Sequence, residues 1–315
     1  MTPVPFAEFE RQVLKLYDPA LRKPNTAKQV RQVLREFGAL PAVQTTADLD
    51  PTAIAHWIAA HPERSAVTIE SLLRALGPLL KFAVFKGWLD RSPLEYRGPS
   101  QWVRPDDRPE PKARPGSRTL GEVGRVLELA DAEARAGGWE RKRLRALVYC
   151  YAYLGLRGGE AVHLWRTDVD LAARTVKVQA HREDRWTPKT LQSAAILPIA
   201  RPLEPVLRYW LRQTGCRWLF PGVRRRGPWT GGAAGQSPLD QVRELGKRAG
   251  VPDLTIHSLR KTVGTYAKTW GLGQLELKGL LRHSDVETQA WYDDGPAEAL
   301  RPAVSRVSYP MSQAG

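Results

Sequence analysis

The last third of this 315-residue chain holds side chains whose types and spacing suit phosphate chemistry. His257 and Arg260 lie three residues apart in the segment IHSLRKT, so a helix would place them on one face. A second histidine, His283, lies in an HSD segment, and Tyr292 follows it nine residues later. Cationic groups bind phosphate and a phenol can attack it, so this stretch predicts a nucleophilic reaction at phosphorus.

A second group of polar residues precedes this stretch. Arg157 and Glu160 have the same three-residue spacing in LGLRGGEAVHLW, which predicts that their side chains meet on one helix face. Lys189 lies in a TPKT turn between two stretches in which apolar and polar residues alternate. This alternation predicts strands of a small antiparallel sheet within residues 174–199, with Lys189 in the hairpin.

Taken together, these residues resemble the active-site set of the tyrosine recombinases, the phage-integrase family of site-specific DNA recombinases: Arg157, Lys189, His257, Arg260, His283 and Tyr292. The flanking sequence agrees as well. LGLRGGEAVHLW is similar to the family's arginine box, TPKTLQSAAILPI to its lysine hairpin, and IHSLRKT to its His-x-x-Arg box. LLRHSDVETQAWY is similar to the segment that joins the second histidine to the nucleophile.

Two positions depart from the family pattern. Arg282 stands where the family usually has glycine before the second histidine, and Ser258 follows the first histidine. Glycine takes a positive φ at little cost and arginine does not, so the backbone at Arg282 is expected to differ from that of the family. Arg282 is also a candidate for an additional phosphate contact.

The resemblance implies cleavage of a DNA strand through a 3′-phosphotyrosine intermediate, with Tyr292 as the nucleophile. Arg157 and Arg260 would clamp the phosphate, because a planar guanidinium stays charged and can hold two phosphate oxygens. The covalent ester stores the bond energy, so rejoining needs no ATP, and no metal ion or other cofactor is expected. Other tyrosines lack the spacing from an HSD segment, namely Tyr153, Tyr266 and Tyr309.

Two further residues of the set would transfer protons during strand cleavage. Lys189 is assigned as the general acid for the departing 5′-oxygen, with Lys177 as an alternative. His257 would take up and return the proton of Tyr292, because histidine is the side chain that titrates nearest neutrality.

His283 and Glu160 complete the set. His283 would donate a hydrogen bond to a non-bridging oxygen of the phosphate. Glu160 would take no part in the chemistry and would instead orient Arg157 or His257.

The charge of the chain indicates a polyanionic partner. Its 48 Lys and Arg outnumber 33 Asp and Glu, which gives a net charge of +15. Residues 1–97 hold 13 basic and 10 acidic residues, a balance of +3, whereas residues 118–300 hold 29 and 20, a balance of +9. Double-stranded DNA is therefore the expected partner, bound mainly by the second half of the chain.

Composition also bears on location and redox state. The sequence has no run of 18 apolar residues, and its N-terminus, MTPVPFAEFERQ, has no signal-peptide core, so a soluble cytoplasmic protein is expected. Cys150 and Cys216 form no CxxC pair, so neither a zinc site nor a disulfide is expected.

The expected fold class is mainly α with a small antiparallel β-sheet. Residues 1–97 predict four short helices, an all-α domain that resembles the family's core-binding domain. Residues 98–117 are rich in proline and predict an extended linker, residues 118–300 an α+β catalytic domain, and residues 301–315 a C-terminal tail. In the family such a linker lets the two domains close around a duplex, and the tail often docks on a neighbouring protomer.

Two other functions fit part of the pattern. A type IB topoisomerase uses a similar residue set but only relaxes supercoils. The helical domain before the linker favours a recombinase instead. Such an enzyme would integrate, excise or resolve DNA, for example that of a mobile genetic element. A non-catalytic DNA-binding protein on the same scaffold would have no use for Tyr292. Self-assembly into a tetramer on DNA and accessory DNA-bending proteins are the further partners that the resemblance implies.

Overall fold

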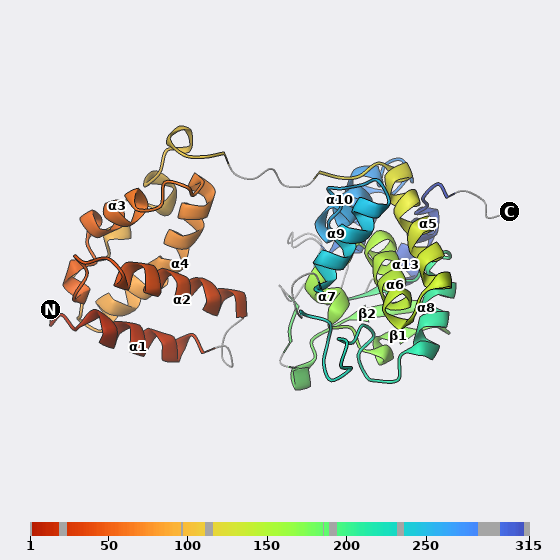
Figure 1. The fold of residues 1–315 in the computed structure, drawn as a ribbon, viewed down its shortest axis with the longest axis horizontal. Helices are drawn as coiled ribbons and strands as arrows, with labels where there is room; N and C mark the ends of the chain where they lie inside the picture. The colour runs from red at the N-terminus through yellow and green to blue at the C-terminus, as the bar shows by residue number, and fades with distance from the viewer. Residues whose placement is uncertain are drawn as a thin grey trace. The chain divides into compact units, whose positions relative to one another are not determined.

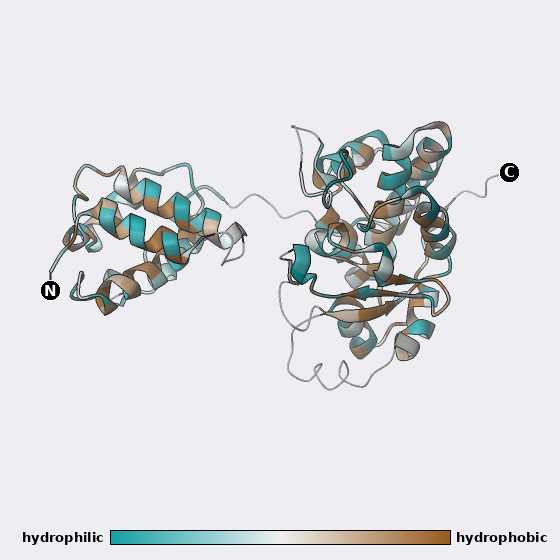
Figure 2. Cartoon of the chain, turned by 90° about the horizontal axis from the view of Figure 1, so that it is seen from below, coloured by the Kyte–Doolittle hydropathy of each residue, from teal (hydrophilic) through white to brown (hydrophobic). Residues whose placement is uncertain are grey.

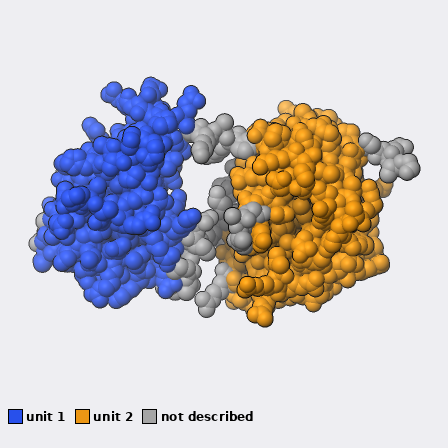
Figure 3. Space-filling model, in the orientation of Figure 1, with its two compact units in different colours: residues 1–113 blue, residues 114–315 orange. Residues whose placement is uncertain are grey.

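The computed structural model describes residues 2–18, 24–95, 97–110, 116–184, 186–188, 194–231, 236–282 and 297–311. The chain divides into two compact units, unit 1 (residues 1–113) and unit 2 (residues 114–315), shown in Figure 3. The division falls inside the segment that the sequence predicts as a linker. Within the described residues, no helix is long and apolar enough to cross a bilayer.

Unit 1 is all-helical in its described part (Figure 1). Its α-helices carry the apolar stripes that the sequence predicts: α1 (Phe6–Leu16), α2 (Pro24–Gly38), α3 (Pro51–Ala59) and α4 (Ala66–Phe85). Two residues start helix α3: Asp50 accepts a hydrogen bond from the backbone nitrogen of Ala53 at 2.8 Å, and Pro51 occupies the first turn.

Helix α4 differs from its expectation at Gly77-Pro78. The sequence predicts an interruption there, because proline lacks the backbone donor and crowds the preceding turn. The structure instead shows one continuous helix from Ala66 to Phe85. Leu76, Leu79 and Leu80 are all buried on either side of the proline, and their packing holds the helix together.

The first part of the predicted linker packs on unit 1 and is not extended. Trp102 and Val103 lie against its apolar core. The Arg108 guanidinium donates to the backbone carbonyls of Ile58 at 2.9 Å and His61 at 2.8 Å, so it satisfies acceptors at the end of α3. Short 3-10 helices at Pro99–Gln101 and Pro105–Asp107 lie within this stretch, and another at Pro93–Glu95 precedes it.

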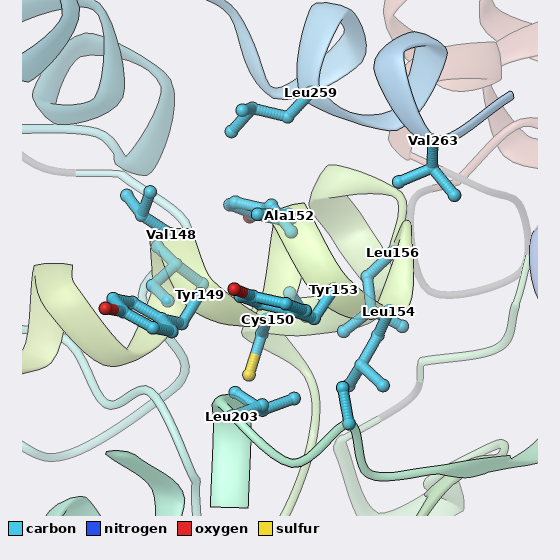
Figure 4. Close-up of a cluster of buried hydrophobic side chains, with 14 of the residues drawn as sticks. Val148, Tyr149, Cys150, Ala152, Tyr153, Leu154, Leu156, Leu203, Leu259 and Val263 are labelled. Carbon is cyan, nitrogen blue, oxygen red and sulfur yellow. The ribbon is translucent and has the colours of Figure 1, made fainter. Parts of the chain in front are cut away.

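Unit 2 is built around α6 (Trp139–Leu154), a helix whose first half is charged and whose residues from Ala146 to Leu154 are all buried. Other helices of the unit surround it in Figure 1: α5 (Leu120–Ala136), α8 (Leu203–Gln213), α9 (Pro238–Arg248) and α10 (Ile256–Tyr266). Figure 4 shows the centre of this core, with Leu259 and Val263 contributed by α10. The arrangement fixes α10, which carries His257 and Arg260, against α6.

A small sheet completes the unit. Strands β1 (Val169–Asp170), β2 (Thr175–Val178) and β3 (Ala195–Pro198) pair antiparallel in that order. Val176 lies opposite Leu197, both are buried, and Figure 2 shows the apolar strands in brown. The mainly α fold with a small antiparallel sheet confirms the expected fold class, and within the described part of the predicted stretch 174–199 the ladder pairs Thr175–Val178 with Ala195–Pro198.

The C-terminal residues belong to the core of unit 2. Helix α13 (Ala297–Arg306) contacts β3 and α11 (Gln274–Leu281), and Val307 and Tyr309 beyond it are buried. A Cβ atom on Gly124 of α5 would lie 1.9 Å from the carbonyl oxygen of Pro310, so only glycine fits there. The prediction of a separate tail from residue 301 is therefore wrong for the described residues, because their apolar side chains are buried within unit 2.

Candidate active site

Arg157 lies in the short connection between α6 and α7 (Gly158–Val162). The connection begins at Gly155, whose φ of +54° ends α6 in the left-handed region. A Cβ atom at this position would also lie 2.8 Å from Cδ2 of Leu281. Glycine thus allows the Arg157 loop to approach the end of α11 closely.

The predicted contact between Arg157 and Glu160 is present. The backbone nitrogen of Arg157 donates to Oε2 of Glu160 at 2.8 Å, and its Nη1 donates to Oε1 at 2.7 Å. Arg157 is the residue that caps α7, so the pair meets at a helix start and not on the face of a continuous helix. The Arg157 side chain is 30% exposed and that of Glu160 only 2%, so the carboxylate lies beneath the arginine.

His257 and Arg260 lie in the first turns of α10, as their spacing predicts. Thr255 caps this helix by accepting from the backbone nitrogen of Ser258 at 3.0 Å, and Ser258 in return accepts from the backbone nitrogen of Thr255 at 2.8 Å. The serine after the first histidine therefore has a structural role. His257 is exposed, whereas Arg260 is only 7% exposed.

Backbone carbonyls join the arginine-bearing segments to the end of α11. Arg260 donates to the carbonyl oxygens of Gly155 and Leu281. Nη2 of Arg157 donates to the carbonyl oxygen of Arg282 at 3.3 Å. Two arginines from distant parts of the sequence are thus anchored to the residues that directly precede His283.

Arg282 departs from the sequence-based expectation. Its backbone has φ +53°, the conformation that the family's glycine takes easily, so the arginine keeps this geometry at a cost of about 1–2 kcal/mol. Its side chain is fully buried, and its Nη2 donates to Oε2 of Glu160 at 2.6 Å. The expectation of a phosphate contact is corrected here, because the buried guanidinium binds the Glu160 carboxylate.

Glu160 remains ionised in spite of its burial. Burial raises the pKa of the Glu160 carboxyl, but the positive charge of Arg282 and the hydrogen bonds from Arg157 lower it more, and the net pKa lies below its usual value. The sequence predicts that Glu160 orients Arg157 or His257. Its hydrogen-bond partners in the structure are Arg157 and Arg282.

Residues 123–297, more than half of the chain, match the model of the phage integrase family. The chain belongs to the phage integrase family. This confirms the family resemblance seen in the sequence.

Relatives and solved structures agree with this membership. Tyrosine recombinase XerD of Mycobacterium leprae (strain TN) is 30% identical over 251 residues, which cover 75% of this chain and 72% of that protein. Tyrosine recombinase XerC of Bifidobacterium longum (strain DJO10A) is 26% identical over 218 residues, which cover 60% of this chain and 57% of that protein. The Tn1549 transposon integrase, solved with circular intermediate DNA, has a TM-score of 0.65 at 16% identity, with 97% of this chain and 100% of that chain covered. At that identity the structural match supports the fold.

Three residues of the integrase-like set, Lys189, His283 and Tyr292, lie outside the described residues. Their assignments stay predictions. Lys177, the alternative general acid, lies on β2 with its side chain exposed.

Two of the rival tyrosines of this integrase-family member, Tyr153 and Tyr309, are poorly placed to attack DNA. Tyr153 is 1% exposed and Tyr309 is 7% exposed. Burial, followed by the charge of Asp131, raises the pKa of Tyr153 to about 12. Burial also raises the pKa of Tyr309 well above its usual value. A buried phenol that resists ionisation is a poor nucleophile, which leaves Tyr266 as the half-buried rival to Tyr292 among the tyrosines weighed from the sequence.

The segment before Lys189 is anchored by Asp184, which the sequence reasoning missed. Its carboxylate accepts from the indole nitrogens of Trp165 at 2.7 Å and Trp218 at 2.9 Å, and from the Arg217 guanidinium at 2.7 Å. No local signal in the sequence indicated this, because Trp165, Arg217 and Trp218 lie 19 to 34 residues from Asp184 in the chain.

Trp186 extends the same anchor toward the Arg157 loop. Its ring stacks on His163 with centroids 4.8 Å apart and planes 7° apart. Burial lowers the pKa of His163, although its hydrogen bond to Gly159 opposes this, so the ring stacks as a neutral aromatic. Trp186 thus connects the chain before Lys189 to the end of α7.

Proposed function

We propose that this chain is a site-specific DNA recombinase that cleaves and rejoins double-stranded DNA through a 3′-phosphotyrosine intermediate. One observation carries the proposal. Arg157 and Arg260 are both anchored to backbone carbonyls at Leu281 and Arg282, immediately before the segment that holds His283 and Tyr292 in the sequence. This arrangement supports a phosphate clamp built next to a nucleophile.

The two arginines would offset the negative charge of the phosphate, which is the main barrier to its attack by a nucleophile. The charged oxygens of a phosphodiester repel a nucleophile, and further negative charge develops on them in the transition state. Two fixed guanidinium groups would neutralise that charge and hold the phosphorus in line with the attacking oxygen. The hydrogen bonds of Arg157 to Glu160 and of Arg260 to Gly155 pre-organise both groups.

In the proposed cleavage step, the Tyr292 oxygen forms a bond to phosphorus as the bond from phosphorus to the 5′-oxygen breaks. His257 takes the phenolic proton, Lys189 protonates the departing 5′-oxygen, and His283 donates to a non-bridging oxygen. Rejoining is the reverse, with a 5′-hydroxyl attacking the phosphotyrosine. The number of phosphodiester bonds is conserved, so the reaction needs no ATP, and the arginines supply the charge for which other enzymes use a metal ion.

The partner follows from this chemistry. The net charge of +15 supports binding to a double-stranded DNA backbone. The Tn1549 integrase with a similar fold was solved with DNA. A tetramer on DNA, accessory DNA-bending proteins, a core-binding role for unit 1 and a cytoplasmic location remain predictions from the resemblance.

The decisive experiment is the capture of a covalent protein–DNA adduct that survives SDS. Purified protein is incubated in EDTA with nicked suicide substrates drawn from the DNA that flanks its own gene. Wild type should form the adduct and Tyr292→Phe should not, while Tyr266→Phe should behave as wild type. An adduct that persists in Tyr292→Phe and disappears in Tyr266→Phe would overturn the assignment.

A second assay separates recombination from relaxation. Wild-type protein is mixed with supercoiled plasmids that carry or lack the site found in the capture experiment. Strand exchange between two site-bearing DNAs supports a recombinase, whereas relaxation of any plasmid without exchange would indicate a topoisomerase.

A further inference from the structure

We propose that Arg282 is a positioning residue that preserves the positive charge of the phosphate clamp, by taking up the negative charge of Glu160. The inference rests on the proposed function, since it concerns how Arg157 meets a phosphate. It gives a role to an arginine that stands where the family usually has glycine.

Glu160 divides its two carboxylate oxygens between two arginines. Oε1 accepts from Nη1 of Arg157 at 2.7 Å, and Oε2 accepts from Nη2 of Arg282 at 2.6 Å. Oε2 also accepts from the backbone nitrogen of Arg157 at 2.8 Å. Each carboxylate oxygen of Glu160 therefore accepts a hydrogen bond from a different guanidinium group.

Arg282 gives the group of Arg157, Glu160 and Arg282 a net positive charge, beside Arg260, which donates to the same Gly155 carbonyl as Arg282. Arg157 and Arg282 contribute two positive charges and Glu160 one negative charge. Without Arg282, the buried Glu160 would balance Arg157 completely. Glu160 and Arg282 are 2% and 0% exposed, so water and salt screen their fields weakly, and the remaining positive charge lies at Arg157, the most exposed member.

Burial and backbone geometry show that Arg282 is held in place firmly. Its guanidinium also donates to the carbonyls of Leu280 at 2.9 Å and Gly155 at 3.3 Å. These bonds keep a non-glycine residue at φ +53°, a conformation that persists only where the surroundings over-determine it. An unfavourable backbone conformation that is kept beside a proposed reaction centre indicates that the Arg282 side chain has a function there.

The test varies charge and shape separately at position 282. Arg282→Lys keeps the charge and loses the planar fork, whereas Arg282→Met loses the charge and keeps an unbranched side chain. Single-turnover cleavage of the suicide substrate should fall about 10-fold or more in Arg282→Met, which is less than the roughly 100-fold loss typical of a group that contacts the reacting charge directly. Arg282→Lys should stay within about 5-fold of wild type, because the charge is what the clamp requires.

The double variant Glu160→Gln/Arg282→Met provides the decisive comparison. It removes both buried charges, so Arg157 keeps its positive charge, and cleavage should recover relative to Arg282→Met. A substrate with a neutral methylphosphonate at the cleaved position should also reduce the defect of Arg282→Met, because less charge has to be neutralised. Thermal unfolding of each variant identifies any that fail to fold. If Arg282→Met fails to fold, the cleavage rate of Arg282→Lys relative to wild type tests the inference.

Three outcomes would overturn the inference: cleavage by Arg282→Met equal to wild type, a folded Arg282→Lys as defective as Arg282→Met, or a double variant with no recovery. Failure of the proposed function looks different. It would appear as an absence of any adduct in wild type, or as full activity in Arg157→Met.

Discussion

The hydroxyl of Tyr309 donates a hydrogen bond to the backbone carbonyl of Ala152, 2.7 Å away and 157 residues earlier in the chain. The Tyr309 ring packs edge-on against Tyr153, at a centroid distance of 5.3 Å, and against Trp270, at 5.6 Å. This bond joins the C-terminal end of the described chain to the central helix of unit 2. The C-terminal residues are consequently part of the unit that carries the site.

Truncation after Arg306 should destabilise unit 2. It removes Val307 and Tyr309, both buried, and burial of one such side chain contributes about 1.5–3 kcal/mol. Truncation after Met311 keeps both residues and serves as the matched control. The thermal midpoint of the full chain should fall by several degrees in the first variant and stay near wild type in the second. Equal midpoints would show that the C-terminal residues add no stability.

Gly124→Ala tests the same packing from the opposite side. The new methyl group would lie 1.9 Å from the carbonyl oxygen of Pro310, so the C-terminal segment has to move. Gly121→Ala on the same helix is the control, because a Cβ there meets nothing within 4 Å. Hydrogen-exchange mass spectrometry should show faster exchange in the peptide around residues 303–311 for Gly124→Ala only. Similar exchange in both variants would contradict the close approach.

We expect the ion pair of Glu36 in unit 1 to make a pH-dependent contribution to the free energy of unfolding. Burial raises the pKa of its carboxyl, but hydrogen bonds from Arg64 at 2.7 and 2.9 Å and from Gln32 lower it to about 2. A carboxyl whose pKa is depressed in the folded state stabilises the fold above its unfolded pKa, and this contribution is lost as pH falls from 4.5 through about 2. Glu36→Gln should therefore cost about 1–3 kcal/mol at pH 7 and progressively less in acid.

The measurement for Glu36 is urea unfolding of the full chain at several pH values, followed by hydrogen exchange in peptides of α2. Glu63→Gln is the control, since Glu63 also approaches Arg64 but is 65% exposed and should contribute little. A loss for Glu36→Gln that stays constant down to pH 2 would contradict the ion-pair explanation.

Trp186→Ala should slow strand cleavage about 10-fold by loosening the chain that leads into Lys189, provided that Lys189 is the general acid. A substrate with sulfur in place of the 5′-bridging oxygen tests this route, because a thiolate leaves without a proton. That substrate should restore cleavage in both Trp186→Ala and Lys189→Ala. Restoration in Lys189→Ala alone would mean that Trp186 acts elsewhere.

Local signals made the helices and the arginine pairs predictable. Thr119, predicted as a cap, begins α5, and Pro51, predicted to open its helix, lies in the first turn of α3, because helix starts depend on a few neighbouring residues. The contact of Arg157 with Glu160 follows from their spacing for the same reason. These features are set within one helical turn, which a single sequence reveals.

Features that depend on contacts between distant parts of the chain could not be predicted from the sequence. Pro78 stays inside a helix because buried leucines from both of its sides pack in the core. Arg282 was predicted to face phosphate because nothing local shows that Glu160 lies beside it, 122 residues away in the chain. An acidic residue in an apolar helix start was the one hint, since a buried carboxylate needs cations.

The C-terminal hydrogen bond of Tyr309 also sets an order of events during synthesis. Unit 1 ends at residue 113, so a ribosome releases all of its core residues well before it releases residues 307–309 of unit 2. Unit 2 cannot complete its core until Val307 and Tyr309 have left the ribosome, because both are buried beside helices made much earlier. A nascent chain therefore lacks the complete core of unit 2 until residues 307–309 have been released, so the unit that carries Arg157 and Arg260 folds after unit 1.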